Sequence, residues 1–257
     1  ENPLLLTFLY HVYKYNLELP RRRVELYRLS VNLMLDWDME TNRPTHIQVK
    51  DRDAKKEVLK KVAYYYHTHQ RREIQESELI AQVKTYLPDS LREKFTAERL
   101  IREIENSSGI LRHRTAESYQ FIHLTFQEYL TADCINDNRD EELPKLMKRL
   151  HNPWWREVTL LLASTMGNAT SLIYRILDYE RQTTEESEKL PCLFIAFNCL
   201  FEAVIDADAR NQVLDAFVRL PYHQILDVIQ DIVGPIEAGN EDLETLFVNI
   251  LNSPHES

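Results

Sequence analysis

Residues 121–132 read Phe-Ile-His-Leu-Thr-Phe-Gln-Glu-Tyr-Leu-Thr-Ala, and the spacing of their apolar side chains changes period within this stretch. Up to about Leu124 the residues suit a β-strand, in which His123 shares one face with Tyr119 and Phe121. Beyond that point the apolar positions recur at helical spacing. The stretch therefore predicts a strand that leads directly into a helix.

The elements on either side of the change can be predicted from the same pattern. Thr125 and Glu128 have the spacing of a capping box, so the helix is expected to open at Thr125 and run to about Ile135. A second β-type run, Ile110–Arg114, precedes the first, and the turn-forming residues 115–118 lie between them. The two runs therefore predict a β-hairpin.

Upstream of the hairpin the pattern is helical, and it ends at Gly109, which suits a helix C-terminus. Three helices are predicted here, at Asp53–His67, Ser77–Tyr86 and Ala97–Ser107. Helices followed by a β-hairpin form a winged helix, a variant of the helix-turn-helix. We therefore assign residues 41–138 to a winged-helix domain.

Residues 1–40 are predicted to form a helical domain. Asn2 can cap a first helix, and Pro3 suits its first position because the N–H there has no intrahelical partner. Pro20 is expected to start a second helix, and residues 39–50 are predicted to be a loop. The apolar stripe of the second helix is Val24, Tyr27, Val31, Met34 and Leu35.

Residues 139–257 are predicted to be entirely helical, after a polar boundary at 136–142. Prolines are expected at three helix starts, at Pro153, Pro191 and Pro221, and the first two are separated by about the period of HEAT-like repeats. An exposed acidic loop is predicted at 183–189. The fold class is thus mainly α: a helical segment, a winged helix with a β-hairpin, and a HEAT-like helical region that could sense a signal.

The charge of the chain is unevenly distributed. The formal net charge is −10, and residues 139–257 alone contribute 10 basic and 20 acidic groups. Phosphate neutralisation requires clustered Lys and Arg, so nucleic acid is an unexpected partner for this region. With only four glycines, the chain also has few positions for phosphate-cradling loops.

The chain carries three cysteines, Cys134, Cys192 and Cys199, without the spacing of a disulfide framework. Such cysteines are typical of reduced thiols in the cytoplasm, mostly as small apolar core residues. The start of the chain lacks a signal peptide, and the longest apolar run, 190–201, is too short to span a bilayer. We therefore expect a cytoplasmic location and no membrane partner.

Catalytic motifs are missing from the sequence. Gly234 and Gly239 have the glycine spacing of a P-loop, but Asn240 and Glu241 stand where Lys and Ser or Thr are required. His67 and His69 form an H-x-H pair without further zinc ligands, and are best interpreted as a polar helix end. No nucleophile–base motif accompanies them. The sequence therefore predicts no catalytic residues and no metal site.

Three stretches together resemble the NACHT family of STAND NTPases, which includes animal NOD-like receptors and many bacterial relatives. Residues 121–129 resemble the signature F-x-H-x-[ST]-F-Q-E-[YF] at the end of the family's winged-helix domain. Residues 2–7, Asn-Pro-Leu-Leu-Leu-Thr, resemble the element that begins its first helical domain, and residues 19–27 resemble the helix that follows. The resemblance covers residues 1–138 and implies a role in signal transduction, with defence as the typical setting.

The resemblance also implies two nucleotide contacts. In the family, the proline of the N-P element packs on the adenine of ADP, which here is Pro3, and the winged-helix histidine bonds the β-phosphate, which here is His123. The Walker A and B motifs, and with them Mg²⁺ and tight ADP or ATP binding, belong to a nucleotide-binding core that in the family precedes such a region. The implied partner is that core, and this chain alone is expected to be no ATPase.

Two alternatives remain open. A DNA-binding winged helix would use Ala97–Ser107 as its recognition helix, but there Glu98, Glu103 and Glu105 outnumber the arginines. The wing residues Arg112, His113 and Arg114 favour this alternative. A scaffold would bind an unknown protein or ligand on the acidic C-terminal helices.

Overall fold

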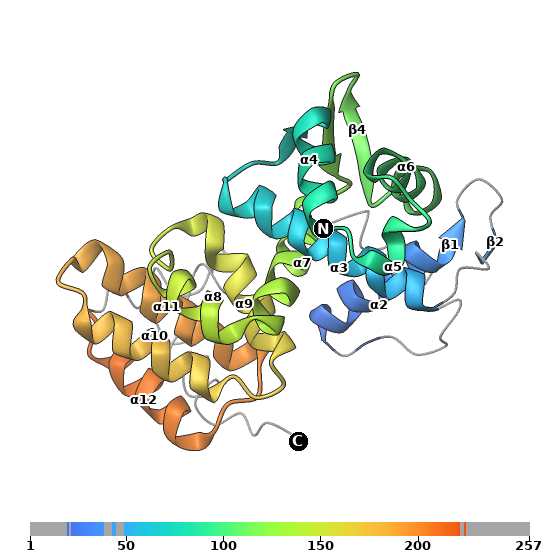
Figure 1. Cartoon of the computed structure of the whole chain (residues 1–257). Helices are drawn as coiled ribbons and strands as arrows, with labels where there is room; N and C mark the ends of the chain where they lie inside the picture. Colours follow the sequence, from blue (N-terminus) through green and yellow to red (C-terminus); the bar gives the residue numbers. More distant parts are fainter. Residues whose placement is uncertain (1–19, 21, 39–42, 45–48, 222–223, 225–257) are drawn as a thin grey trace, which may run out of the picture. The chain divides into compact units, whose positions relative to one another are not determined.

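The computed structural model describes residue 20 and residues 22–38, 43–44, 49–221 and 224 (Figure 1). Pro3, the helix predicted after Asn2 and the pair Gly234 and Gly239 lie outside the described residues, as does most of the segment after Pro221. The chain divides into two compact units at Val213 and Leu214. All described helices and strands before α12 (Ala207–Val218) belong to the first unit. The predicted domain ranges 1–40, 41–138 and 139–257 stay predictions.

A winged helix follows a short strand pair. The elements are α3 (Val49–Thr68), β3 (Glu73–Gln75), α4 (Glu76–Tyr86), α5 (Asp89–Arg92), α6 (Ala97–Glu103), the π-helical turn η1 (Ile104–Ser108), β4 (Leu111–Thr115) and β5 (Ser118–Phe121). The predicted helices and hairpin are confirmed, although β5 ends at Phe121 rather than Leu124. The prediction lacked a third strand, β3, which pairs antiparallel with β5 and completes the order β3-β5-β4. A three-residue strand is too short to show a period of two.

The turn after η1 depends on Gly109. Its φ of 64° lies in the left-handed region, and its N–H donates to the carbonyls of Ile104 (3.1 Å) and Glu105 (3.0 Å). The predicted helix C-terminus at this glycine is confirmed. This turn directs the chain from the recognition-helix position into β4.

We expect Gly109→Ala to lower the free energy of unfolding by about 1 kcal/mol, because a Cβ disfavours positive φ. Urea denaturation of the chain measures the loss. Gly109→Asn should lose less, since asparagine tolerates this conformation better. Equal stability of the alanine variant and the wild type would show that the turn is unstrained.

Helix α2 (Arg23–Asp36) confirms the second predicted helix, and the predicted stripe from Val24 to Leu35 is buried. The prediction of a loop over 39–50 is partly wrong. Strand β1 (Trp37–Asp38) pairs with β2 (Arg43–Pro44), and α3 already begins at Val49. The pairing offers backbone hydrogen-bond partners to residues whose side chains show no strand pattern.

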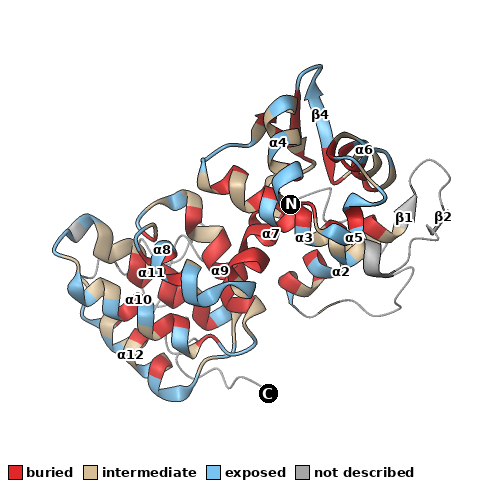
Figure 2. Cartoon of the chain, viewed as in Figure 1, coloured by how far each residue is buried: buried red, intermediate tan, exposed pale blue. Residues whose placement is uncertain are grey.

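Helix α7 (Leu124–Asp137) forms the centre of the described fold. Its residues 126–135 are all buried, and Figure 2 shows this burial along nearly the whole helix. It packs against α2, α3 and α9. A helix covered on several sides buries polar side chains together with apolar ones, here Gln127, Glu128, Thr131 and Asp133.

The C-terminal part of the unit is helical, as predicted. Its elements are α8 (Arg139–Met147), the 3₁₀ turn η2 (Pro153–Trp155), α9 (Arg156–Thr165), α10 (Thr170–Gln182), α11 (Glu186–Glu202) and α12 (Ala207–Val218). Three local predictions were wrong. The polar boundary 136–142 is helical on both sides of Asn138, the acidic loop is confined to residues before Glu186, and Pro191 lies inside α11 rather than at its start. Pro153 does begin a helical turn.

A 38-residue offset recurs in the contacts of this region. Ser164 donates through Oγ to the carbonyl of Glu202 (2.6 Å), and Asn168 donates through Nδ2 to Asp206 Oδ1 (3.0 Å); both pairs are 38 residues apart. The loop between α9 and α10 therefore lies against the loop between α11 and α12. This arrangement supports the predicted repeat, although the proline spacing that suggested it was partly coincidental.

The winged helix and the helical region are joined through His67, at the end of α3. Its Nε2 lies 3.0 Å from the carbonyl of Trp154, and Trp154 Nε1 donates to the His67 carbonyl (2.9 Å). The ring stacks on Trp154 and meets Trp155 edge-on. The interpretation of this histidine as a polar helix end is wrong, because its side chain is fully buried.

The burial of His67 predicts a pH dependence of stability. Burial lowers the pKa of His67 to about 4, the bond to Trp154 opposes the shift, and the charge of Arg149 adds to it. The unfolded chain therefore binds a proton that the folded chain does not between about pH 6.5 and 4. Across that window the folded state should lose up to about 3 kcal/mol as the pH falls, at 1.36 kcal/mol per pKa unit.

The contribution of His67 to the pH dependence of stability can be separated from that of other titrating groups by comparing variants with the wild type. Glu128, whose pKa burial raises to about 7, acts in the opposite direction. We expect the free energy of unfolding of His67→Phe, measured by urea denaturation from pH 4 to 7, to fall less than that of the wild type as the pH is lowered. That of His151→Gln, which changes an exposed histidine, should fall as much as that of the wild type. Parallel curves for wild type and His67→Phe would contradict a buried neutral His67.

Candidate functional site

His123 lies at the junction of β5 and α7 and is the N-cap of that helix, with extended backbone angles of φ −149° and ψ 145°. Its Nδ1 accepts a hydrogen bond from the backbone N–H of Thr125 (3.2 Å) and lies 2.9 Å from Thr125 Oγ1. The side chain is part-exposed. Of the two nucleotide-contacting residues that the resemblance implies, His123 is described and Pro3 is not.

The capping bond determines the tautomer of His123. Because Nδ1 accepts from a backbone N–H, it carries no proton, and in the neutral ring the proton belongs to Nε2. Burial lowers the pKa of His123, and the positive charge of Arg72 lowers it further. At neutral pH the side chain is thus a neutral imidazole whose Nε2–H can donate a hydrogen bond.

The capping box predicted at Thr125 and Glu128 is wrong. The cap is His123, one residue before the helix, and Glu128 is buried within it. An imidazole acceptor takes the place of the expected hydroxyl, and the backbone donor is the N–H of Thr125. Burial raises the pKa of Glu128 to about 7; Glu157 adds to the shift, and Arg23 and Arg72 oppose it.

Gln127 has a structural role at the start of α7. The side chain is buried, and Nε2 donates to the carbonyl of Arg71 (3.0 Å). The preceding residue Gln70 has a positive φ of 53°, so the turn between α3 and β3 is tight. Gln127 therefore fixes the start of α7 to the turn that carries Arg72.

Arg72 is a candidate site residue that the sequence analysis missed. Its side chain is exposed, its guanidinium lies 5.8 Å from the ring centre of Trp154, and its charge acts on both His123 and Glu128. A phosphate near His123 would meet this cation as well as the imidazole donor. The only sequence signal was a pair of arginines, Arg71 and Arg72, four and five residues after the predicted helix end at His67.

Arg23, the first residue of α2, connects this helix to two helices of the C-terminal region. Nη1 lies 2.6 Å from Glu157 of α9, and Nε lies 2.8 Å from Glu202 of α11. Burial lowers the pKa of Arg23, but the two carboxylates outweigh it and the net shift is upward. The arginine is therefore charged and ion-paired with α9 and α11 together.

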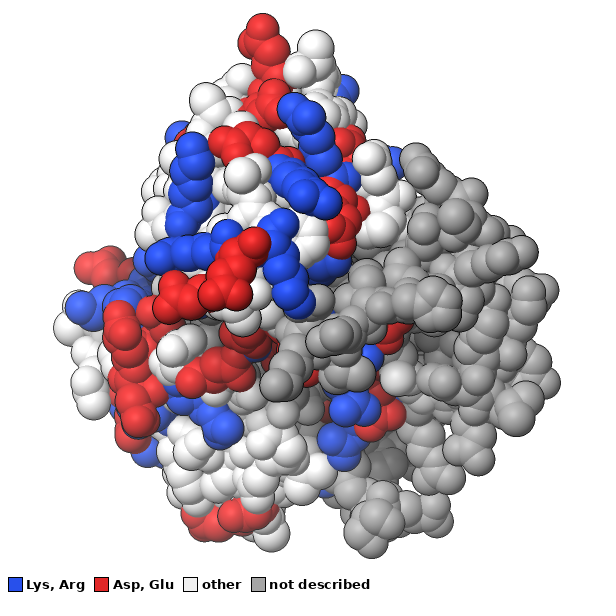
Figure 3. Space-filling model, turned by 45° about the vertical axis from the view of Figure 1, so that its right-hand side comes forward, with Lys and Arg blue, Asp and Glu red and all other residues white. Residues whose placement is uncertain are grey.

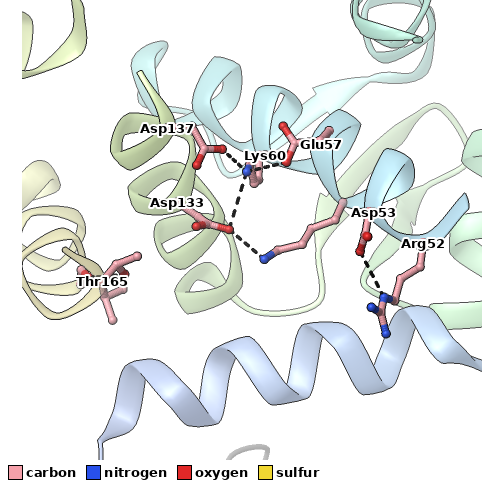
Figure 4. A network of polar contacts seen from close by, with 9 residues as sticks. Arg52, Asp53, Glu57, Lys60, Asp133, Asp137 and Thr165 are labelled. Atoms are coloured by element: carbon pink, nitrogen blue, oxygen red, sulfur yellow. Dashed lines mark hydrogen bonds and ion pairs between the residues drawn. The ribbon is translucent and has the colours of Figure 1, made fainter. Parts of the chain in front are cut away.

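Ion pairs also join α3 to α7. Figure 4 shows Lys60 between Glu57, Asp133 and Asp137, and Lys56 lies 2.9 Å from Asp133 Oδ2. A cavity of about 220 Å³ opens beside this network. The residues that line it are Arg22, Val24, Glu25, Arg28, Lys56, Tyr129, Asp133, Ser164 and Thr165. His123 is not among them, and the mixed charges do not select a ligand.

The wing does not form a basic patch. Arg114 pairs with Glu73 (2.9 Å), and His113 contacts Glu105 through Nδ1 (2.7 Å) and its backbone N–H (3.0 Å). On the face drawn in Figure 3, Lys and Arg side chains are intermixed with Asp and Glu over the described residues. These neighbouring carboxylates would repel a nucleic-acid backbone. The alternative of a DNA-binding winged helix is thus poorly supported.

Among the described residues, no helix is both long and apolar enough to cross a membrane. Within the same ranges, no three His, Cys, Asp or Glu side chains are grouped as metal ligands would be. The three cysteines Cys134, Cys192 and Cys199 are buried, and burial raises the pKa of each thiol to about 12. They are therefore thiols rather than thiolates at neutral pH.

Comparison with known proteins identifies the family of the central part of the chain. Residues 23–135 match the model of a family described as the winged helix-turn-helix domain C-terminal to NACHT. Neither the curated proteins nor the solved structures include a significant match. The matched range starts with α2, includes the three-stranded sheet and ends within α7, so it includes His123, Thr125 and Arg72. Residues 23–135 are therefore a NACHT-associated winged helix-turn-helix domain, and further helices follow it in this chain.

Proposed function

We propose that this chain is the autoinhibitory control region of a NACHT-type signalling ATPase. In the inactive state the winged helix closes on ADP held by the nucleotide-binding core. A signal sensed by the C-terminal helices opens that contact, ADP exchanges for ATP, and the protein oligomerises. The setting would be cytoplasmic, and defence, as in NOD-like receptors, is the leading biological context.

The observation that carries the proposal is the state of His123. The capping bond at Nδ1 places the proton on Nε2, and a neutral Nε2–H donates to a phosphate oxygen without needing protonation. The nearby charge of Arg72 favours an anion at the same surface. An added γ-phosphate would crowd or reposition this contact, which is a means of distinguishing ADP from ATP.

Two sets of contacts support coupling between the C-terminal helices, which would sense the signal, and the winged helix, which would contact ADP. Arg23 of α2 forms ion pairs with Glu157 of α9 and Glu202 of α11. His67 of α3 exchanges hydrogen bonds with Trp154 of η2. A displacement of these helices would therefore act on α2 and α3. The ligand that causes such a displacement would be a protein or other molecule bound to the C-terminal helices.

In this scheme the chain supplies some of the residues of a nucleotide site and the core supplies the rest, and the chain alone catalyses no reaction. His123 and Pro3 would contact the nucleotide, while the phosphate loop and the Mg²⁺ ligands belong to the core. Calorimetry tests this directly. We expect the 257-residue chain to show no sub-micromolar binding of ADP or ATP and no ATP hydrolysis, and the protein that includes the core to retain ADP. Tight ATP binding by the chain alone would contradict the proposal.

A further inference from the structure

We propose that Thr125 is a positioning residue for His123: its backbone N–H and its hydroxyl together hold the imidazole in the tautomer that carries the proton on Nε2. The inference deepens the proposed function, because it names the group that prepares the phosphate-facing histidine. It concerns the ring itself, however, and can be tested without any nucleotide.

The backbone N–H and the hydroxyl of Thr125 both contact Nδ1 of His123. The Thr125 N–H donates to Nδ1 at 3.2 Å, and Thr125 Oγ1 lies 2.9 Å from the same atom. The amide can only donate, so Nδ1 must be the acceptor. The hydroxyl then also donates to the Nδ1 lone pair, since two acceptor atoms would repel each other. An Nδ1–H tautomer would lose the amide bond and place its proton against the amide hydrogen, and the hydroxyl could then only accept from Nδ1–H.

The side chain of Thr125 also acts on Tyr27 of α2. Burial raises the pKa of that tyrosine, and Thr125 is among the groups that oppose the rise. Thr125 is thus linked both to the His123 ring and to a side chain of α2.

Thr125 thereby links α2 to the His123 ring. Tyr27 is held in place by its ring contacts with Phe126 and Tyr129, at 6.2 Å between centroids in each case. Helix α2 also carries Arg23, which pairs with α9 and α11. A shift of α2 that separates Tyr27 from Thr125 would change the surroundings of the Thr125 side chain, so the His123 ring would respond to the position of α2.

The test is NMR of the 257-residue chain labelled with ¹⁵N-histidine, in which ring ¹⁵N shifts report the tautomer and a His123→Gln variant assigns the signal. We expect the Nε2–H form to dominate in the wild type. Thr125→Val keeps the backbone bond and removes the hydroxyl, so the Nδ1–H fraction should rise by about 2- to 12-fold, the range for one net hydrogen bond. Thr125→Ser should restore the wild-type ratio.

Thr165→Val is the matched control. It makes the same change at a threonine whose hydroxyl donates to Leu161 within α9 (2.7 Å), and should leave the His123 ratio unchanged. A dominant Nδ1–H form in the wild type, or a ratio that changes less than twofold in Thr125→Val, would overturn the inference. A shifted ratio together with unaltered ADP release in His123→Leu would support the role of Thr125 and refute the nucleotide role of His123.

Discussion

Replacing His123 with leucine should speed ADP release from the intact, core-containing protein by roughly 10- to 150-fold. Leucine fills a similar volume but cannot donate to a β-phosphate, and a hydrogen bond to a charged group contributes about 1.5–3 kcal/mol. Stopped-flow displacement of a fluorescent ADP analogue measures the rate. The same variant should raise the fraction of protein that oligomerises without a signal.

The control for this prediction is His151→Leu. His151 is exposed, and its Nδ1 is 3.5 Å from Glu188, so the substitution makes the same chemical change in the C-terminal helices. Its ADP release should match the wild type. If His123→Leu also released ADP at the wild-type rate, the family's phosphate contact would not operate in this protein.

Trp155→Ala should destabilise the chain by about 3–5 kcal/mol, the usual cost of removing a buried tryptophan. The Trp155 side chain is 2% exposed, its ring meets His67 edge-on, and the guanidinium of Arg149 lies 4.6 Å from its ring centre. The lost stability would therefore come from the contact between His67 of the winged helix and the tryptophans of η2. Chemical denaturation measures it, ideally with separate probes on α3 and α11.

Phe201→Ala is a suitable comparison, because Phe201 is also aromatic but 48% exposed. Its loss should stay below about 1 kcal/mol. A loss of similar size for both variants would indicate that burial at this contact contributes no special stability. A Trp155→Ala variant that unfolds in two transitions would show that the two regions had become independent.

The winged helix could be predicted because its elements are long enough to show a period. In the helices predicted from Ser77 and from Ala97, apolar residues recur at helical spacing, and the hairpin before His123 consists of two β-type runs joined by turn-forming residues. Strand β3 has three residues and takes its identity from pairing with β5, a long-range contact that no local window contains. Pro191 was placed at a helix start by propensity, but helix packing in the repeat region carries α11 past it.

The candidate site could be predicted only in part, for a similar reason. His123 was identified from a motif, and the structure adds its cap role and its tautomer, which depend on the conformation of a single junction. Arg72 and Tyr27 come from other segments and meet His123 or Thr125 only in the fold. His67 was taken as a polar helix end because its partner, Trp154, is 87 residues away.

The most direct test of the account is amide hydrogen exchange over Phe121–Thr125 in the core-containing protein, with ADP and then with a non-hydrolysable ATP analogue. If the winged helix closes on ADP through His123, these amides should exchange more slowly with ADP than with the ATP analogue. The difference should vanish in His123→Leu. Equal exchange rates with both nucleotides in the wild type would contradict the claim that this domain is a nucleotide-dependent switch.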